Sequence, residues 1–165
     1  MRDDVDELAD RWAAAGMSSQ VIARLELSKR AARIGGLFEQ AMKVELTAIG
    51  LTYAEFDVLA ALSRGGPPHR LRPSELTRSL FLTSGGTSNV LQRLTNDGYV
   101  VREIDENDGR SRWVRLTENG QSVTDLAMAA SMRVHKDLLA GVNEQNVRQA
   151  ADALRDVLSV IGKRR

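Results

Sequence analysis

Residues 84–93 carry side chains that suit hydrogen bonding to a polyanion. The segment combines hydroxyl and amide side chains with two glycines and a single arginine. Proteins use hydroxyl, amide and guanidinium groups to contact base edges and phosphates in DNA. A cluster of Ser, Thr and Gly is also typical of a loop followed by a helix cap, so that alternative stays open. The candidate DNA-contacting residues here are Ser84, Thr87, Ser88, Asn89, Gln92 and Arg93.

Two arginines beside a predicted turn form a second candidate contact surface. Arg110 and Arg112 follow Asp105-Glu-Asn-Asp-Gly109, which has the composition of a turn. At a hairpin tip they would reach phosphates or an adjacent minor groove. Residues 64–117 hold nine basic and six acidic residues, a net charge of +3, against +1 for the whole chain. Arginines at a hairpin tip are often simply solvated, so this pair alone does not decide the function.

The residue types needed for catalysis, metal binding and thiol chemistry are scarce. The chain has no cysteine, which excludes disulfides, thiolate metal sites and thiol redox sensing. The two histidines, His69 and His135, lie far apart in the sequence and form no metal-ligand pair. No set of nucleophile, base and orienting residue can be assembled, and no phosphate-binding motif is present. We therefore expect no enzymatic activity, no cofactor and no metal site.

The ends and the apolar runs of the chain bear on its location. Residues 1–17 carry two arginines and five acidic residues, and no long apolar run follows, so no signal peptide is predicted. The longest apolar stretches, such as Val58–Leu62, are much shorter than a membrane-spanning helix. We expect a cytoplasmic protein that does not bind a membrane.

The periodicity of the apolar residues divides the chain into helices and one hairpin. A capping-box pattern at Thr52-Tyr-Ala-Glu55 predicts a helix start, and Gly65-Gly-Pro-Pro68 predicts its end. The β-branched and aromatic runs Tyr99–Ile104 and Arg112–Leu116 predict two strands of a hairpin. The other predicted elements are helices over about residues 5–15, 19–48, 73–80, 84–97, 118–140 and 144–162.

This order of elements predicts the fold. A helix, a short helix, a turn, a further helix and a hairpin form a winged helix-turn-helix, whose second paired helix enters the major groove of DNA. We predict a mainly α fold with a small β-hairpin wing, in which residues 51–117 form the DNA-binding lobe. Residues 1–50 and 118–165 supply helices whose apolar faces suit a dimerisation bundle or, equally, a monomeric core. A winged helix that binds only other proteins, without a ligand, is the alternative function.

Several segments resemble the MarR family of transcription regulators. They are Leu51–Leu62, Ser74-Glu-Leu76, Asn96-Asp-Gly-Tyr-Val100, Asp105–Arg112 and Val114-Arg-Leu-Thr-Glu-Asn-Gly120. The last two match the wing motif and are the most specific part of a resemblance that covers about residues 20–162. The resemblance implies a homodimer in which the terminal helices of two chains interlock. It also implies a regulator, commonly a repressor, that binds a palindromic site on double-stranded DNA and is released by a small ligand.

Further residues resemble the urate-responsive and PecS-like subgroup of that family. Trp12, Asp57 and Arg102 match three members of the subgroup's ligand-binding set, in which two arginines face an aromatic or carboxylate anion. Val90 stands where the subgroup has its arginine in the recognition helix. The resemblance therefore implies a ligand pocket that includes these three residues. The missing guanidinium weakens the expectation of anion binding, because its fork pairs bidentately with carboxylates.

Overall fold

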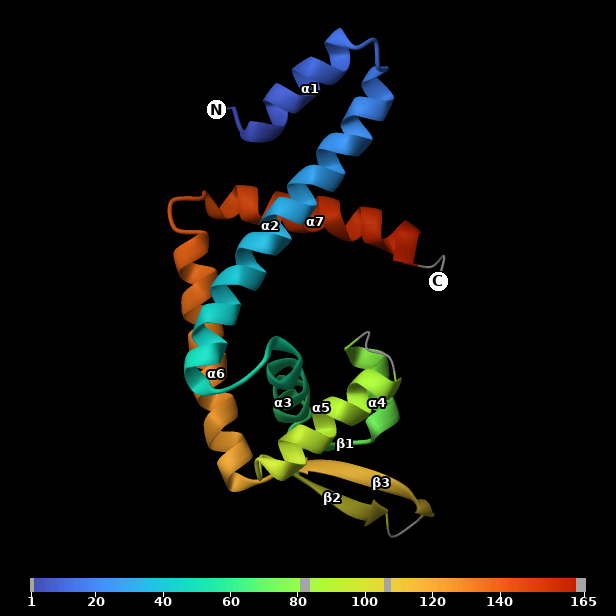
Figure 1. Cartoon of the computed structure of the whole chain (residues 1–165), viewed down its shortest axis with the longest axis vertical. Helices are drawn as coiled ribbons and strands as arrows, with labels where there is room; N and C mark the ends of the chain where they lie inside the picture. Colours follow the sequence, from blue (N-terminus) through green and yellow to red (C-terminus); the bar gives the residue numbers. More distant parts are fainter. Residues whose placement is uncertain (1, 81–83, 106–107, 163–165) are drawn as a thin grey trace.

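The computed structural model of the chain describes residues 2–80, 84–105 and 108–162; of residues 84, 105 and 108–111 it describes the backbone alone. The fold is mainly helical with a small antiparallel sheet, as predicted, and Figure 1 shows its helices and strands. In chain order the elements are α1 (Asp4–Ala14), α2 (Ser19–Ile49), α3 (Tyr53–Arg64), β1 (Arg70–Leu71), α4 (Pro73–Ser79), α5 (Ser84–Asn96), β2 (Val100–Asp105), β3 (Asp108–Leu116), α6 (Glu118–Leu138) and α7 (Glu144–Ile161).

The start of α3 is set by the capping box that the sequence predicts. The Thr52 amide donates to Glu55 Oε2 over 2.7 Å, and the Glu55 amide donates to Thr52 Oγ1 over 3.3 Å. These two bonds satisfy amides that have no partner within the helix. α3 then runs through the middle of the lobe that α4, α5 and the sheet complete (Figure 1).

The sheet has three strands in the order β1-β3-β2, all antiparallel. The predicted hairpin is β2 and β3, which pair from Val100 opposite Leu116 to Ile104 opposite Arg112. β1 was not predicted. It has two residues and pairs Arg70 with Arg115 and Leu71 with Val114, so its conformation depends on β3 rather than on a local pattern.

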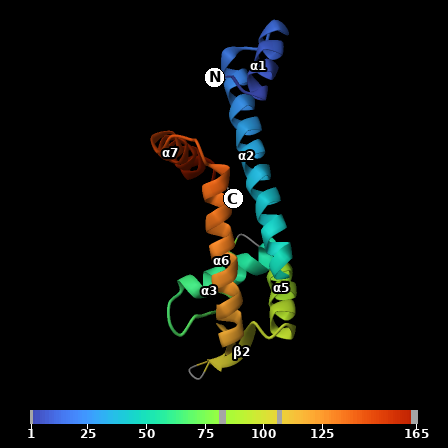
Figure 2. The same cartoon turned by 90° about the vertical axis from the view of Figure 1, so that its left-hand side faces the viewer.

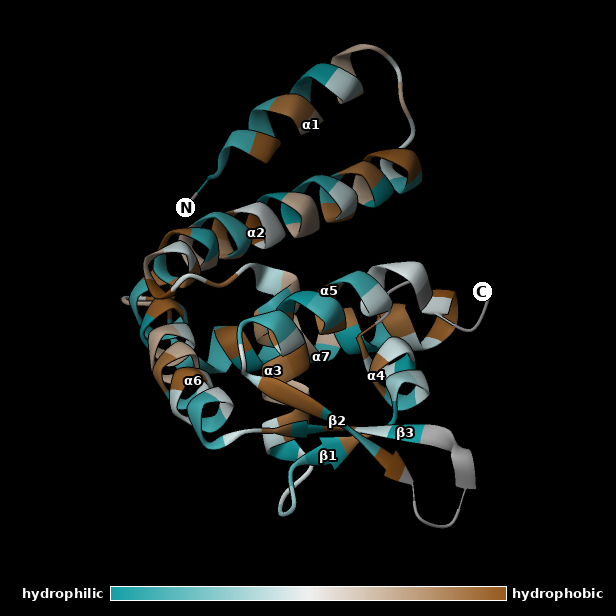
Figure 3. Cartoon of the chain, turned by 60° about the horizontal axis from the view of Figure 1, so that its bottom comes forward, coloured by the Kyte–Doolittle hydropathy of each residue, from teal (hydrophilic) through white to brown (hydrophobic). Residues whose placement is uncertain are grey.

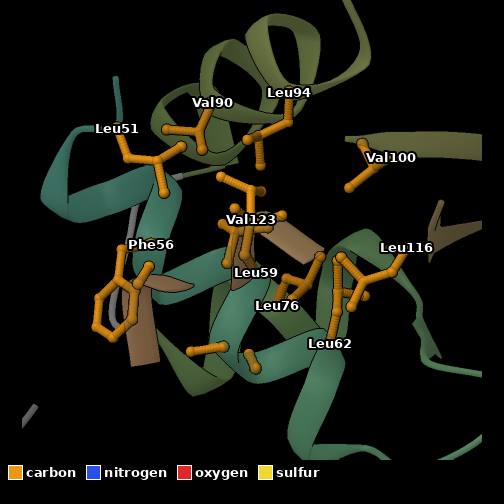
Figure 4. Close-up of a cluster of buried hydrophobic side chains, with 14 of the residues drawn as sticks. Leu51, Phe56, Leu59, Leu62, Leu76, Val90, Leu94, Val100, Leu116 and Val123 are labelled. Carbon is orange, nitrogen blue, oxygen red and sulfur yellow. The ribbon is translucent and has the colours of Figure 1, made fainter. Parts of the chain in front are cut away.

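The main core lies where α3, α4, α5, α6 and the sheet meet. Figure 4 shows ten of these side chains converging, and most are less than 5% exposed. Burying a side chain of this size contributes about 1.5–3 kcal/mol, so this cluster fixes how α5 is presented. The labelled residues are Leu51, Phe56, Leu59, Leu62, Leu76, Val90, Leu94, Val100, Leu116 and Val123.

α2 and α6 form a long stem beside this lobe. The two helices lie side by side in Figures 1 and 2, and Met42 and Leu46 of α2 are buried. Hydrophobic residues recur along the whole of α2, as Figure 3 shows, and many of them remain exposed. α7 projects from the far end of α6 and buries none of its residues within the chain (Figure 2).

α1 packs along the N-terminal half of α2. Its N-cap is Asp3, whose side chain accepts from the amides of Val5 and Asp6. Arg30 of α2 faces this helix and forms ion pairs of 2.8 Å with Asp3 and Asp6. α1 is therefore held at the end of the stem that lies away from the lobe (Figure 1).

No single helix in the described part of the chain is long and apolar enough to span a membrane. Only α2 and α3 taken together meet that criterion, and they are bent by 81° relative to each other. No group of three or more metal-ligating side chains occurs among the described residues either.

Candidate nucleic-acid interface

α5 presents one polar face and one apolar face. Ser88, Asn89 and Gln92 are exposed, and their spacing of one, three and four places them within one arc of the helix. The opposite arc holds Val90, Leu91 and Leu94, which are 6%, 2% and 0% exposed. The polar arc therefore faces away from the protein core.

Thr87 lies differently from its polar neighbours. It is 2% exposed, and its hydroxyl accepts a 3.1 Å hydrogen bond from Thr77 Oγ1 of α4. A hydroxyl enclosed between two packed helices does not reach a base edge unless those helices separate. We therefore assign Thr87 to the contact between α4 and α5 and remove it from the candidate base contacts.

Arg93 borders the polar arc and forms an ion pair with Glu55 of α3. Its Nε lies 3.1 Å from Glu55 Oε1, and the Arg93 side chain is 54% exposed while that of Glu55 is 7% exposed. The buried carboxylate is thus paired with a cation whose guanidinium still reaches solvent. One carboxylate therefore links the start of α3 to α5.

The start of α5 and the tip of the wing contain two further predicted contacts. Ser84 is the first residue of α5, and Arg110 belongs to β3. Both side chains lie outside the described part of the structure. Their roles in DNA binding remain predictions from the sequence.

One face of the wing continues from the core toward the tip. Alternate residues of a strand share a face, so Val100, Arg102 and Ile104 of β2 lie on one side of the sheet. Val100 is buried, whereas Arg102 and Ile104 are exposed. Arg112, opposite Ile104, is exposed on the same face. This face, which begins under α5, therefore carries two exposed arginines.

The other face of the sheet holds an aromatic and arginine cluster that the sequence analysis did not identify. The guanidinium carbons of Arg70 and Arg72 lie 4.7 and 4.8 Å from the ring centre of Trp113. Arg115 Nε lies 2.6 Å from Glu103 Oε1. The alternation of Arg70, Leu71 and Arg72 is a signal that could have revealed this face, because residues two apart share a side of a strand.

The predicted ligand residues do not gather within one chain. Trp12 is on α1 at one end of the stem, Asp57 is on α3, and Arg102 is on the wing (Figure 1). Asp57 lines a cavity between α2 and α3, but neither Trp12 nor Arg102 lines it. Val90 is packed into the core, so an arginine at its position would be buried in this chain.

Comparison with known proteins identifies relatives that are helix-turn-helix regulators, in agreement with the winged-helix arrangement of α3, α4, α5 and the wing. The model of the MarR family matches residues 49–111. The HTH-type transcriptional regulator SarZ of Staphylococcus aureus is 30% identical over 115 residues, which cover 68% of this chain and 71% of SarZ. The HTH-type transcriptional regulator PecS of Dickeya dadantii is 27% identical over 113 residues, 68% of each protein.

The fold has a close counterpart among solved structures. A mutant MarR protein of E. coli in complex with operator DNA superposes with a TM-score of 0.74 at 22% identity, over 86% of this chain and 99% of that chain. At this identity the similarity establishes the shared winged-helix fold. Together with the sequence relatives, which are named as transcription regulators rather than enzymes, it settles the family. This chain belongs to the MarR family of HTH-type transcription regulators.

Proposed function

We propose that this chain is a homodimeric repressor that binds a palindromic DNA site through α5 and the wing. The observation that carries the proposal is the exposed polar arc of α5 beside a wing face with two exposed arginines. Ser88, Asn89 and Gln92 would contact base edges, because amides and hydroxyls pair with the donors and acceptors of the major groove. Ser84 at the start of α5 would contact a phosphate or base at the groove edge.

The arginines of the interface have different tasks. Arg110 and Arg112 would contact phosphates or the minor groove beside the site of α5. Arg102 shares the sheet face of Arg112, so we assign it to the DNA surface as well, in place of the ligand role that the subgroup resemblance implies. Arg93 would reach a phosphate or a guanine while Glu55 holds its guanidinium in place.

Dimerisation would place two copies of α5 in successive major grooves. α7 buries no residue within the chain. Its apolar side chains therefore remain open to solvent, and Leu158 and Val160 are 61% and 59% exposed. Exposed apolar faces of this extent are typical of protein interfaces. A twofold dimer would present its reading helices about 34–36 Å apart, which requires a palindromic site.

A small molecule would relieve repression. The subgroup resemblance implies an aromatic or carboxylate anion, and with Arg102 assigned to the DNA surface, Trp12 and Asp57 remain as its candidate ligand residues. Because Trp12 and Asp57 lie at different ends of the stem, they would share a pocket only across the dimer. A ligand acts on DNA binding only if it favours a conformation of the dimer that differs from the DNA-bound one.

Alanine substitutions test the DNA interface directly. The probe is a DNA duplex that spans the region upstream of this protein's own gene. We expect Asn89→Ala and Arg112→Ala each to weaken binding to that duplex by about 1–3 kcal/mol, roughly 5- to 150-fold, measured by fluorescence anisotropy. Arg11→Ala is the control, because this arginine is 74% exposed on α1, away from the wing. Equal affinity for all three variants would contradict the proposed interface and favour a winged helix that binds only proteins.

A further inference from the structure

The wing extends beyond the part of the core that holds its base. Val100, Val114 and Leu116 are buried at the base of the hairpin that β2 and β3 form. Further along, Ile104 is 62% exposed, and Arg112, which lies opposite it, is exposed as well. A hairpin of two strands is only marginally stable on its own. The packing of the core therefore holds the base of the hairpin rather than the part that carries Arg112.

A tryptophan on the opposite face of the sheet lies at the level of Arg112. Trp113 follows Arg112 in β3, so its side chain points to the other side of the sheet. The guanidinium carbons of Arg70 and Arg72 lie 4.7 and 4.8 Å from the centre of its ring. The face of an aromatic ring attracts such a cation, and the attraction is strongest for tryptophan. We call these three side chains, Arg70, Arg72 and Trp113, the Trp113 clamp.

The clamp acts on a very short strand. β1 has two residues, whereas strands of roughly five or six residues are usual. Leu71 packs against the core, so alternation places Arg70 and Arg72 on the outer face, where Trp113 also lies. Because the pairing of β1 with β3 is so short, the contact of both guanidinium groups with the ring is a large part of what keeps the two strands together.

β1 leads directly into the helices that present the DNA-facing surface (Figure 1). Arg72 is the N-cap residue of α4, and its amide donates to Glu75 Oε2 over 2.7 Å. α4 in turn contacts α5 through the 3.1 Å hydrogen bond between Thr77 and Thr87. The clamp therefore joins the strand that carries Arg112 to the pair of helices that presents α5.

We propose that Trp113 is a positioning residue for DNA binding, whose ring holds β1 on β3 and thereby fixes the direction of Arg112 relative to α5. Trp113 lies on the opposite face of the sheet from Arg112, so it acts through the backbone of β3 and not through contact with DNA. The inference rests on the proposed function, because it explains how the wing of the same DNA interface is held in place.

Trp113→Leu tests this role without changing the charge of the protein. Binding to the duplex upstream of the protein's own gene is measured by fluorescence anisotropy between about 50 and 200 mM salt. We expect about a tenfold loss of affinity, because Arg112 is still present but no longer reaches its contact. The plot of the logarithm of the binding constant against the logarithm of the salt concentration should become shallower by about one for each wing that loses this ionic contact. A loss of stability alone would leave that slope unchanged.

Two further variants separate the ring from its surroundings. Trp113→Phe should restore the affinity to within about threefold of the wild type, since an aromatic face remains for the two guanidinium groups. Val101→Ala is the matched control, because Val101 lies on the same face of the sheet and is not part of the clamp. It should leave both the affinity and the salt slope unchanged.

A double-mutant cycle shows whether Trp113 acts through Arg112. Arg112→Ala should weaken binding in the wild-type background but add almost no further loss in Trp113→Leu, because the contact is already broken there. Losses that multiply in the double variant would overturn the proposal. Wild-type affinity and slope in Trp113→Leu would overturn it as well.

Amide hydrogen exchange without DNA tests the clamp itself. The Leu116 amide donates to the His69 carbonyl over 3.1 Å, between β3 and the residue that precedes β1. Trp113 is only partly buried, so Trp113→Leu is expected to fold, and the Leu116 amide should exchange at least about tenfold faster in it than in the wild type. Unchanged exchange would overturn the proposal.

The same preparations separate this inference from the proposed function. If the wild type binds the duplex and Trp113→Leu binds it with equal affinity and slope, the positioning role fails and the regulator function stands. If the wild type binds no duplex, the proposed function fails, and the exchange of the Leu116 amide still decides whether the ring holds β1 on β3.

Discussion

Glu55 connects two parts of the interface through a single carboxylate. It accepts hydrogen bonds of 2.7 Å from both the amide and the hydroxyl of Thr52, and it lies 3.1 Å from Arg93 Nε. The residue is only 5% exposed, so these partners replace the water that the charge loses on folding. The start of α3 and the orientation of Arg93 therefore depend on the same side chain.

Glu55→Ala should destabilise the fold. The variant removes the Glu55 side-chain half of the capping box of α3 and the buried pair with Arg93, and we expect the free energy of unfolding to fall by about 1–3 kcal/mol in urea denaturation. Glu75→Ala is the matched control, because Glu75 accepts from the Arg72 amide in the same capping pattern but is exposed. Equal losses for the two variants would show that the burial of Glu55 and its ion pair contribute nothing.

Some residue roles follow from local sequence and others do not. The capping box at Thr52 and Glu55 was predictable because both partners lie within four positions of each other. The burial of Thr87 was not predicted, because the polarity of a side chain does not reveal which face of a helix packs against α4. The separation of Trp12 from Asp57 depends on the lengths and packing of whole helices, which a list of matching residues does not contain.

At the scale of elements, Gly120 and Thr117 join α6 to the turn after α5. Thr117 Oγ1 donates to the Gly98 carbonyl over 2.7 Å and accepts from the Gly120 amide over 2.9 Å. A Cβ on Gly120 would lie 1.9 Å from the Tyr99 carbonyl oxygen. The stem helix can meet the lobe this closely only because the residue has no side chain.

Gly120→Ala should therefore separate α6 from the turn at Tyr99. Because the obstructing atoms belong to the backbone, we expect a loss of about 1–3 kcal/mol or more in the free energy of unfolding. Gly36→Ala serves as the control, since beyond the neighbouring residues and backbone of α2 itself no atom lies within 4 Å of a Cβ at that mid-helix position. Alanine there should instead gain about 0.5–1 kcal/mol. Thermal melting that ranks the two variants in the opposite order would contradict this account.

The attachment of α1 to α2 depends on charge. Arg30 contacts Asp3, Asp6 and Glu26, each at 2.8 Å. Its hydrogen bonds to Asp3 are the largest cause that lowers the pKa of that carboxyl to about 2. A lowered pKa means that this attachment is fully present above the ordinary pKa of an aspartate. It is lost as the pH falls toward about 2.

Arg30→Ala should return the pKa of Asp3 toward its ordinary value. Carbon-detected NMR titration of the side-chain carboxyls measures this shift directly. Arg33→Ala is the control, because Arg33 pairs with Asp4 at 2.8 Å and is not a cause of the Asp3 shift. An unchanged titration of Asp3 in Arg30→Ala would show that its pKa has another origin.

Long periodic elements were easier to predict than short ones. The helix predicted over residues 19–48 is confirmed as Ser19–Ile49, because its apolar residues recur over many turns. β1 has only two residues and is defined by its pairing with Val114 and Arg115, which no local pattern reports. The winged-helix order was predictable because most of its helix boundaries carry a capping residue, glycine or proline, such as Thr52, Pro73 and Thr117.

At the scale of the whole molecule, the exposed apolar face of α7 should hold two chains together. Leu158→Asp places a charge on this face without disturbing the core of one chain, since Leu158 is 61% exposed. We expect sedimentation velocity to show a shift toward monomer and anisotropy to show weaker operator binding. Gln149→Asp, on the opposite side of α7, should leave both unchanged. A stable dimer in Leu158→Asp would mean that α7 is not the interface.

The central claim is that the protein binds DNA through α5 and the wing. Its most direct test is how the affinity for the duplex upstream of the protein's own gene depends on salt concentration. If α5 and the wing of two chains contact roughly 6–10 phosphates, affinity should fall about 10³- to 10⁵-fold between about 50 and 200 mM salt. The logarithm of the binding constant should decrease linearly with the logarithm of the salt concentration. At each salt concentration the natural duplex should also bind more tightly than a scrambled duplex of equal composition. Affinity that does not change with salt, or no duplex binding at all, would contradict the account.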